Sequence, residues 1–297
     1  MQQESSIQKS YQYCQDIANQ HYENFPTASL LLKKELRPAV AVIYAFARAA
    51  DDFADEGDIP KEKRLALLDG WEHQLDLCLE GKSENPVFIA LADVMLTHEL
   101  PVQLFRDLLT AFRMDVNFQA FKNLDELKFY GKHSADPVGR LMLALHQIDD
   151  EQALQCSDAI CTALQLTNFW QDFKVDIPKG RCYLAEDWLK LAGVDRESLL
   201  LGEVSSAQIQ PALQQAIIET ERLFHMGFGL LPCLPMRLRL QIAATLAGGM
   251  SILKATSKLG DPLRKRPVLT KLDWLLISFK IVFLAMFPHY FAKRGHT

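Results

Sequence analysis

The sequence predicts an all-α protein, and three observations support that prediction. Apolar residues recur at three- and four-residue spacing along most of the 297 residues. The alternating pattern of half-buried strands is hard to find. The breaks between helical segments are short, and none has the length of an interdomain linker. We therefore expect residues 1–297 to form one domain of many helices joined by short connections.

Four segments show the helical periodicity most clearly, namely residues 38–54, 63–79, 102–121 and 153–173. Glycine and proline predict breaks at residues 57–60, 81–86, 131–137, 177–180 and 260–262. With 49% hydrophobic and 23% charged residues, the composition is that of a globular protein. A chain of this length can bury a substantial core, even one hollowed by a ligand cavity.

The C-terminal residues 275–291 are strongly apolar, but Lys280 and Pro288 interrupt them. The stretch is shorter than the roughly 20 residues that a spanning helix needs. Two interpretations stay open: a helix on a membrane surface over about 272–297, or a helix that closes the apolar core.

The charge and the cysteine pattern exclude several other classes of function. A formal net charge of −5 gives no global basic field that would attract nucleic acid. The six cysteines show neither CxxC pairs nor zinc-type spacing with histidine. Because the N-terminal residues lack an apolar secretory segment, we expect a cytoplasmic protein, with attachment to the inner face of the membrane as an extension of that expectation.

A charged stripe interrupts the otherwise apolar helix predicted over residues 38–54. Residues three and four apart are neighbours on a helix, so the residues of this stripe lie on one broad face. They are Tyr44, Arg48, Asp51, Asp52 and Asp55. A solvated face is the usual explanation of acidic residues. On so apolar a helix, however, the carboxylates are expected to border an enclosed space, where they repel unless a cation joins them.

A second stripe of the same kind lies in the helix predicted over residues 153–173 and continues beyond it. Its residues are Gln165, Asn168, Asp172 and Asp176, which follow the spacing i, i+3, i+7 and i+11. Two such helices facing one another would place oxygen ligands on both walls of one cavity. Oxygen ligands suit Mg²⁺, which keeps several waters for a phosphate-bearing substrate. The pair of stripes therefore predicts a metal–diphosphate site.

Three sequence segments also carry a family resemblance. They are YAFARAADDFADE at 44–56, YGKHSADPVGR at 130–140 and QLTNFWQDFKVDIPKGRCYL at 165–184. Over nearly its whole length the chain resembles the squalene/phytoene synthase family of head-to-head isoprenoid synthases. The resemblance implies an isoprenoid-synthase-type helical fold around a central apolar cavity, with an isoprenoid diphosphate as substrate.

The resemblance also implies roles for individual residues. The expected magnesium ligands are Asp51, Asp52, Asp55, Asn168, Asp172 and Asp176, with Asp52 and Glu56 the least secure of the acidic residues. The expected catalytic set is Asp51, Asp55, Asp172, Asp176 and Tyr44. The expected substrate-binding set is Glu23, Asn24, Arg48, Arg140, Gln171, Lys179, Arg181 and Tyr183.

Within the family, the chain is most similar to the hydroxysqualene synthase branch of bacterial hopanoid pathways. The segment HYENFP at 21–26 stands where condensing members carry a Ser-x-Ser-Phe element. Similarly, NFWQD at 168–172 stands where they read Asn-Ile-x-Arg-Asp. The resemblance implies conversion of presqualene diphosphate and water to hydroxysqualene and diphosphate, and functional coupling to the enzyme that makes presqualene diphosphate.

Several alternatives stay open at this point. The chain could condense two farnesyl diphosphates to presqualene diphosphate, squalene or a phytoene-type product. It could also be a head-to-tail prenyltransferase or terpene cyclase, or a scaffold protein without activity. A reductive squalene synthase needs a nicotinamide, and no glycine-rich fingerprint follows a predicted strand. Among the candidates that could position the capturing water, Tyr44, Glu23, Asn24 and Gln171, the sequence selects none.

Overall fold

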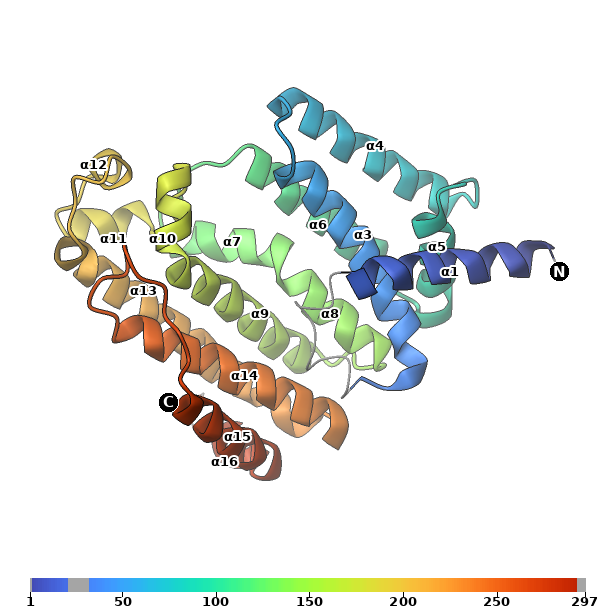
Figure 1. Cartoon of the computed structure of the whole chain (residues 1–297). Helices are drawn as coiled ribbons and strands as arrows, with labels where there is room; N and C mark the ends of the chain where they lie inside the picture. Colours follow the sequence, from blue (N-terminus) through green and yellow to red (C-terminus); the bar gives the residue numbers. More distant parts are fainter. Residues whose placement is uncertain (1, 21–31, 293–297) are drawn as a thin grey trace. The chain divides into compact units, whose positions relative to one another are not determined.

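The computed structural model describes residues 2–20 and 32–292, and every regular element within those ranges is a helix (Figure 1). The prediction of an all-α fold is therefore confirmed. The chain divides into two compact units, the first built from residues 1–117 and 137–149 and the second from 118–136 and 150–297. The expectation of one domain around a central cavity stays a prediction.

The first unit contains α1 (Gln2–Gln20), the short 3-10 helix η2 (Lys34–Leu36), α3 (Arg37–Asp55), α4 (Lys61–Leu79), α5 (Pro86–His98), α6 (Val102–Val116) and most of α8 (Asp136–Leu145). Helix starts follow the local sequence. Asn85 accepts a hydrogen bond from the Val87 backbone N–H at 2.9 Å, and Pro86 occupies the first turn, where a missing N–H costs nothing.

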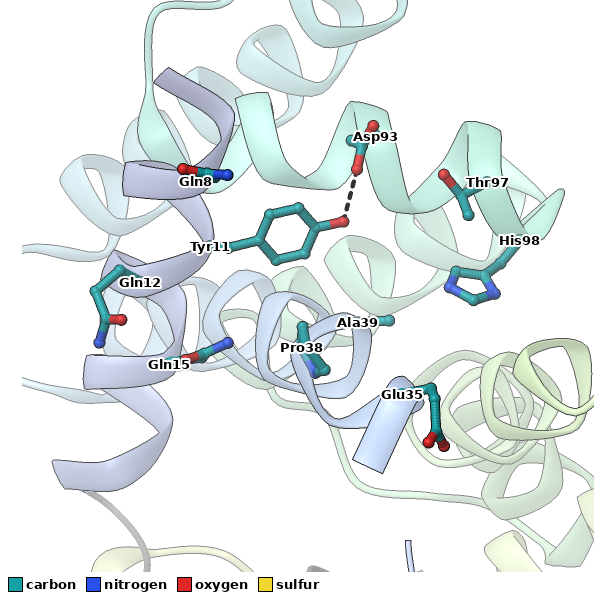
Figure 2. A pocket seen from close by; sticks show the side chains of 10 residues that line it. All are labelled: Gln8, Tyr11, Gln12, Gln15, Glu35, Pro38, Ala39, Asp93, Thr97 and His98. Carbon is teal, nitrogen blue, oxygen red and sulfur yellow. Dashed lines mark hydrogen bonds between the residues drawn. The ribbon is translucent and has the colours of Figure 1, made fainter. Parts of the chain in front are cut away.

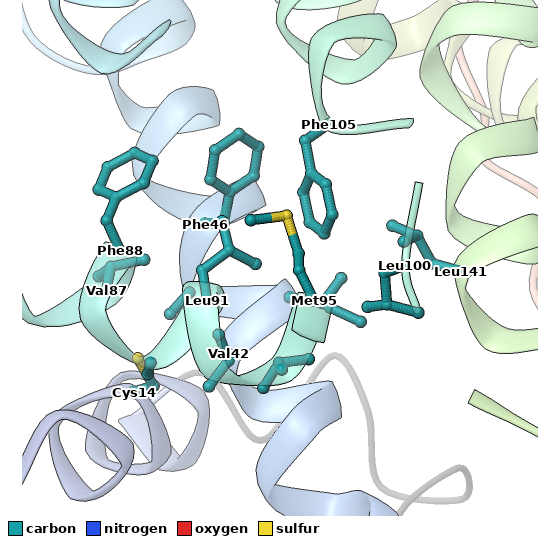
Figure 3. Close-up of a cluster of buried hydrophobic side chains, with 14 of the residues drawn as sticks. Cys14, Val42, Phe46, Val87, Phe88, Leu91, Met95, Leu100, Phe105 and Leu141 are labelled. Atoms are coloured by element: carbon teal, nitrogen blue, oxygen red, sulfur yellow. The ribbon is translucent and has the colours of Figure 1, made fainter. Parts of the chain in front are cut away.

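The core of the first unit is centred on Phe46 of α3 (Figure 3). Its ring makes edge-on contacts with Phe88 and Phe105, at centroid distances of 5.8 Å and 5.2 Å. Trp71 donates its indole N–H to the Phe46 carbonyl at 3.3 Å, which satisfies the polar end of a buried ring. This packing fixes α3 along one face, and the charged stripe lies on the rest of the same helix.

The second unit contains α7 (Leu124–Ser134), α9 (Glu151–Gln171), α10 (Phe173–Asp176), η3 (Ile177–Lys179), α11 (Glu186–Leu191), α12 (Arg196–Leu200), α13 (Ser206–Gly227), η4 (Phe228–Cys233), α14 (Met236–Ser257), α15 (Lys271–Met286) and α16 (Pro288–Ala292). Its central element is α9, which packs against α7, α13 and α14. Buried Trp170 of α9 donates to Thr220 Oγ1 of α13 at 2.8 Å. At Gly249 of α14 an added Cβ would lie 2.6 Å from Leu164, so the glycine permits close packing on α9.

Two boundaries differ from the predicted ones. The helix expected over 102–121 ends at Val116, where Asn117 caps it by donating its side-chain N–H to the Arg113 carbonyl at 2.9 Å. Phe118 and Phe121 leave the helix and pack beside the Tyr183 ring instead. Tertiary aromatic packing has therefore overridden a helical periodicity. A break is also expected over 131–137, but within that range only Ala135 lies outside a helix, between α7 and α8.

The apolar C-terminal stretch forms α15 and α16, and α15 lies along α14 (Figure 1). In the part of the chain that the structure describes, no helix has the length and apolar character required to cross a membrane.

Candidate functional site

The first charged stripe lies where the sequence predicts it, on the last turns of α3. Ala45, Phe46 and Ala50 on the same helix are fully buried, whereas Tyr44 and Arg48 are partly buried. The helix ends at Asp55, so the carboxylates gather at its C-terminal end, where the helix dipole is least favourable to negative charge. Such an arrangement lowers stability unless a cation compensates it.

Arg48 pairs with the carboxylates directly, and Arg64 donates to the Phe53, Glu56 and Gly57 carbonyls at the helix end. The guanidinium of Arg48 lies 3.3 Å from Asp51 Oδ2 and 2.6 Å from Asp52 Oδ1. It also contacts the Glu56 carboxylate. We call Arg48, Asp51, Asp52, Asp55 and Glu56 the first acidic cluster. With one arginine and four carboxylates, of which Arg48 pairs with three, the first acidic cluster keeps a net negative charge.

Burial and the neighbouring carboxylates both act on the titration of Asp51. Burial raises the pKa of Asp51, Arg48 lowers it, and the neighbouring carboxylates of Asp55, Asp52 and Glu56 raise it further. About half of the Asp51 side chain is nevertheless exposed, at 51%. Burial likewise raises the pKa of Tyr44, so its hydroxyl stays protonated at neutral pH. An added cation would relieve the repulsion among these groups.

The second stripe differs from the prediction in one respect. The sequence predicts Gln165, Asn168, Asp172 and Asp176 on one continuous helix, but α9 ends at Gln171 and α10 begins at Phe173. Asp172 is the junction: its N–H donates to the Asn168 carbonyl at 3.1 Å, and its own carbonyl accepts from the Asp176 N–H at 2.9 Å. The break buries Phe173 beside Trp170. The expectation of an unbroken stripe is wrong for this reason.

Asp172 has an ion-pair partner that sequence reasoning missed. Arg266, 94 residues further along the chain, places Nε 2.7 Å from Asp172 Oδ1 and Nη2 3.3 Å from Oδ2. This paired geometry is the arrangement in which arginine binds carboxylates and phosphates most strongly. No local signal in the sequence connects Arg266 to Asp172. We call Asn168, Asp172, Asp176 and Arg266 the second acidic cluster.

The loop after α10 carries the remaining predicted residues of the second unit. Gly180 adopts φ +77°, a left-handed conformation that favours glycine. Next to it, Arg181 donates its backbone N–H to the Asp176 carbonyl at 3.0 Å, which ties the loop to the second acidic cluster. Lys179 is exposed. Tyr183 is almost fully buried, and its ring stacks on Phe169 at a centroid distance of 3.7 Å. Hydrogen bonding of Tyr183 to a diphosphate stays a prediction.

The segment between the two stripes contributes a close helix contact. At Gly131 of α7 an added Cβ would lie 2.5 Å from Thr162 Oγ1 of α9. Thr162 in turn donates to the buried carboxylate of Asp136 at 2.8 Å. Sequence analysis did not single out Asp136. Its contact with Thr162 fixes α9 from within the second unit.

Other predicted substrate-binding residues are placed as follows. Arg140 lies on α8, within the first unit, and is partly buried. Gln171 is the last residue of α9 and is also partly buried. Glu23 and Asn24 lie outside the described residues, so their predicted roles stay predictions.

The sequence profile of the squalene/phytoene synthase family matches residues 18–273. The chain belongs to this family. It is accordingly an enzyme of isoprenoid biosynthesis, and the scaffold alternative has no support.

Several squalene/phytoene synthases are similar over most of the chain. The hydroxysqualene synthase of Zymomonas mobilis subsp. mobilis is 34% identical over 262 residues, which cover 86% of each chain. That of Rhodopseudomonas palustris is 34% identical over 260 residues, covering 86% of this chain and 87% of the relative. The solved squalene synthase HpnC from Alicyclobacillus acidocaldarius is similar with a TM-score of 0.80 and 32% identity, covering 86% of this chain and 95% of the other.

The donor chemistry of both acidic clusters fits the magnesium expected in a squalene/phytoene synthase. Carboxylate and amide oxygens are the ligands that Mg²⁺ prefers, and both clusters offer them. Within residues 2–20 and 32–292, no three carboxylate, histidine or cysteine side chains are already grouped as a metal site. Arg48 and Arg266 instead hold the carboxylates. Metal binding therefore requires these ion pairs to rearrange.

A separate pocket of about 410 Å³ lies in the first unit of this family member, among α1, α5 and the start of α3 (Figure 2). Tyr11 donates to Asp93 Oδ2 across it at 2.8 Å, and burial raises the pKa of this tyrosine. Its lining is Gln8, Tyr11, Gln12, Gln15, Glu35, Pro38, Ala39, Asp93, Thr97 and His98. With two carboxylates and neither lysine nor arginine in that lining, the pocket does not suit a diphosphate.

Proposed function

We propose that this enzyme converts presqualene diphosphate and water to hydroxysqualene and diphosphate. The observation that carries the proposal is the extent of similarity. Relatives named hydroxysqualene synthase are 34% identical over 86% of the chain. Relatives named phytoene synthase, such as that of Arabidopsis thaliana, are 30% identical over 68%. Residues 21–26 and Gln171 depart from the pattern expected of condensing members. These departures also favour a hydroxysqualene synthase.

We assign the metal-binding role to the oxygen ligands of both acidic clusters. The ligands are Asp51, Asp52, Asp55, Asn168, Asp172 and Asp176. Magnesium held there would supply a Lewis acid that neutralises charge on the departing diphosphate oxygens. The carboxylates, relieved of their mutual repulsion, would hold the ion and orient the leaving group.

The cationic side chains bind the diphosphate in this proposal. Arg48 has a buried Nε–H without a hydrogen-bond partner among the described residues, which leaves a donor for a phosphate oxygen. Arg266 presents a guanidinium whose paired donors match phosphate as well as carboxylate. Lys179 and Arg181 add positive charge on the loop next to Asp176. These residues would stabilise the charge that develops as the carbon–oxygen bond breaks.

Departure of diphosphate from presqualene diphosphate leaves a cyclopropylcarbinyl cation. The cation rearranges between apolar walls that offer no stray nucleophile. One water then adds to it through oxygen, and one proton is released. Tyr44, protonated at neutral pH, is a candidate to orient that water, as are Gln171, Glu23 and Asn24. The substrate must come from an enzyme that joins two farnesyl diphosphates, which is the expected functional partner.

The test is a product assay with isotopic water. Purified protein with magnesium is offered presqualene diphosphate or farnesyl diphosphate separately, in H₂¹⁸O, and extracted products are identified by mass spectrometry. We expect hydroxysqualene carrying one ¹⁸O from presqualene diphosphate, and no consumption of farnesyl diphosphate. Hydroxysqualene without the label would contradict water capture.

A second candidate function is condensation, because two similar solved structures are named squalene synthase and dehydrosqualene synthase. The same assay separates it from the first. Consumption of farnesyl diphosphate would make this a condensing enzyme. Formation of squalene only when NADPH is added would identify a reductive enzyme instead.

A further inference from the structure

The helix α15 presents its apolar side to solvent. In the described part of the chain, large hydrophobic side chains exposed to solvent concentrate between residues 268 and 290. The exposed ones on α15 are Leu272, Trp274, Leu275, Leu276, Phe279, Val282, Phe283 and Met286. Phe279, the most exposed of them, has 67% of its surface accessible. A helix that is hydrophobic all round is normally covered on every side.

The exposed side chains form one continuous face. α15 packs on α14 and buries Ile277, Leu284 and Ala285. At 3.6 residues per turn, the opposite side of the helix, over an arc of roughly 120°, contains only apolar residues. Lys271 and Ser278 lie at one edge of that arc and Lys280 at the other. We call this side of α15 the outer apolar face.

Positive charge is concentrated in the segment that carries the outer apolar face. Residues 254–292 contain seven lysine and arginine residues and two aspartates, a formal +5 in a chain of net charge −5. Lys271 and Lys280, both exposed, lie at the two edges of the face and form its cationic margin. Hydrogen bonds from Thr270 lower the pKa of Asp273 at the start of the helix, and Lys258 and Lys254, at the end of α14, lower it further. These two lysines therefore add positive charge beside the start of α15.

We infer that the outer apolar face docks on the surface of an anionic lipid bilayer, with α15 lying flat. Apolar side chains between cationic residues are the pattern of helices that rest in the headgroup region. Tyr290 is exposed and its ring contacts Phe283 of the outer apolar face, and such rings favour the membrane–water interface. A second copy of this chain fits less well, because two cationic margins would repel, whereas anionic headgroups attract them.

The first experiment measures binding of the full chain to vesicles by flotation, without substrate, so that its outcome does not depend on the proposed reaction. Vesicles of phosphatidylcholine alone are compared with vesicles containing phosphatidylglycerol. We expect binding to rise by roughly tenfold or more with the anionic lipid, and to fall as salt is added. Equal binding to both vesicle types, or none to either, would overturn the inference.

Two sets of variants separate the apolar from the ionic contribution. The triple variant Leu275→Gln, Phe279→Gln, Met286→Gln should lose binding by roughly tenfold or more. Its matched control, Leu191→Gln, Leu201→Gln, Met226→Gln, removes equally exposed apolar side chains elsewhere in the same unit. Both proteins should keep the wild-type melting temperature, because all six side chains are exposed. If the α15 variant bound vesicles as well as its control, the outer apolar face would not contact the bilayer.

The ionic contribution is tested in the same way. Lys254→Gln, Lys258→Gln, Lys280→Gln should abolish the preference for anionic lipid, whereas Lys122→Gln, Lys128→Gln, Lys190→Gln should retain it. Size measurements of the free protein belong to the same experiment. A dimer that dissociates in the Leu275, Phe279, Met286 variant, together with absence of vesicle binding, would show that the face joins two copies and would overturn the inference.

A tryptophan placed on the outer apolar face provides an optical readout of the docked state. Phe279 lies at the centre of that face, whereas Trp274 lies on the α14 side of the helix, so the variant is Phe279→Trp made together with Trp274→Phe. The other three tryptophans, Trp71, Trp170 and Trp188, are buried. The emission of the indole at 279 should shift to the blue with anionic vesicles and be quenched by brominated acyl chains. An unshifted emission in a vesicle-bound protein would place α15 outside the bilayer.

Discussion

The two acidic clusters carry similar ligands but are built in different ways. In the first acidic cluster, Arg48 and its partners Asp51 and Asp52 share one helix, at the spacing that makes neighbours of residues three and four apart. In the second, Asp172 occupies a helix junction and its partner Arg266 comes from 94 residues away. The first acidic cluster is thus assembled by one helix, whereas the second depends on tertiary packing.

The largest expected effect tests whether both clusters serve one reaction. Asp51→Asn and Asp172→Asn should each lower diphosphate release by about 100- to 1,000-fold, because each removes a charge that holds the metal. The measurement is release of diphosphate from presqualene diphosphate at saturating magnesium. The exposed residues Asp58 and Asp187 provide the controls, since changing either to Asn should leave turnover within about twofold. If either site variant kept full turnover, its cluster would not bind the metal.

The next effect tests the packing that positions the second acidic cluster. Gly131→Ala should lower the free energy of unfolding by about 1–3 kcal/mol, because the new methyl group meets buried Thr162, which its bond to Asp136 holds in place. Urea unfolding followed by circular dichroism measures the change.

The matched control is Gly248→Ala, on a helix of the same unit, where an added Cβ meets nothing within 4 Å. That change should stabilise the protein by about 0.5–1 kcal/mol. If the two alanine variants were equally stable, the contact between α7 and α9 would be looser than described.

A smaller effect concerns the partner of Asp172. Arg266→Gln should raise the KM for presqualene diphosphate by about tenfold and change kcat less, because a paired contact to the diphosphate is lost in both ground and transition states. Steady-state kinetics measure both constants. Lys265→Gln, which changes the exposed neighbour, should leave both unaltered. A KM for the Arg266 variant equal to that of wild type would restrict this arginine to a structural role.

The smallest effect is a stability change with pH in the first acidic cluster. The pKa of Asp51 is raised above 3.8, so the folded state binds more protons than the unfolded state between the two pKa values. Stability therefore falls as pH rises through that window, and the penalty is complete at neutral pH. Without metal, Asp51→Asn should raise the melting temperature by only about 1–3 °C at pH 7, because solvent screens the half-exposed side chain.

Thermal melts in a chelator, repeated towards pH 4, test that assignment. The gain from Asp51→Asn should shrink as the pH falls, because the wild-type carboxyl becomes protonated. A lower melting temperature for Asp51→Asn at pH 7 would show that its ion pair with Arg48 outweighs the repulsion.

The sequence predicted what depends on local spacing. The all-α class, the helices over 38–54 and 63–79 and the stripe that contains Arg48, Asp51 and Asp52 follow from periodicity and from neighbours on one helix. The pairing of Asp172 with Arg266 could not be predicted, because no local pattern brings residues 94 positions apart together. The end of α6 was also missed, since the packing of Phe118 and Phe121 beside Tyr183 is a property of the folded unit.

The junction at Asp172 has a consequence for combining substitutions. Its carbonyl accepts from the backbone N–H groups of Val175 and Asp176, at 2.8 Å and 2.9 Å, so one peptide group sets the direction of both predicted ligands. Side-chain changes at 172 and 176 leave that peptide in place. Changes that alter the backbone, such as glycine or proline at 172, displace both carboxylates together. Their effects will therefore not add to those of changes at 176, and a library that varies both positions will show strong epistasis.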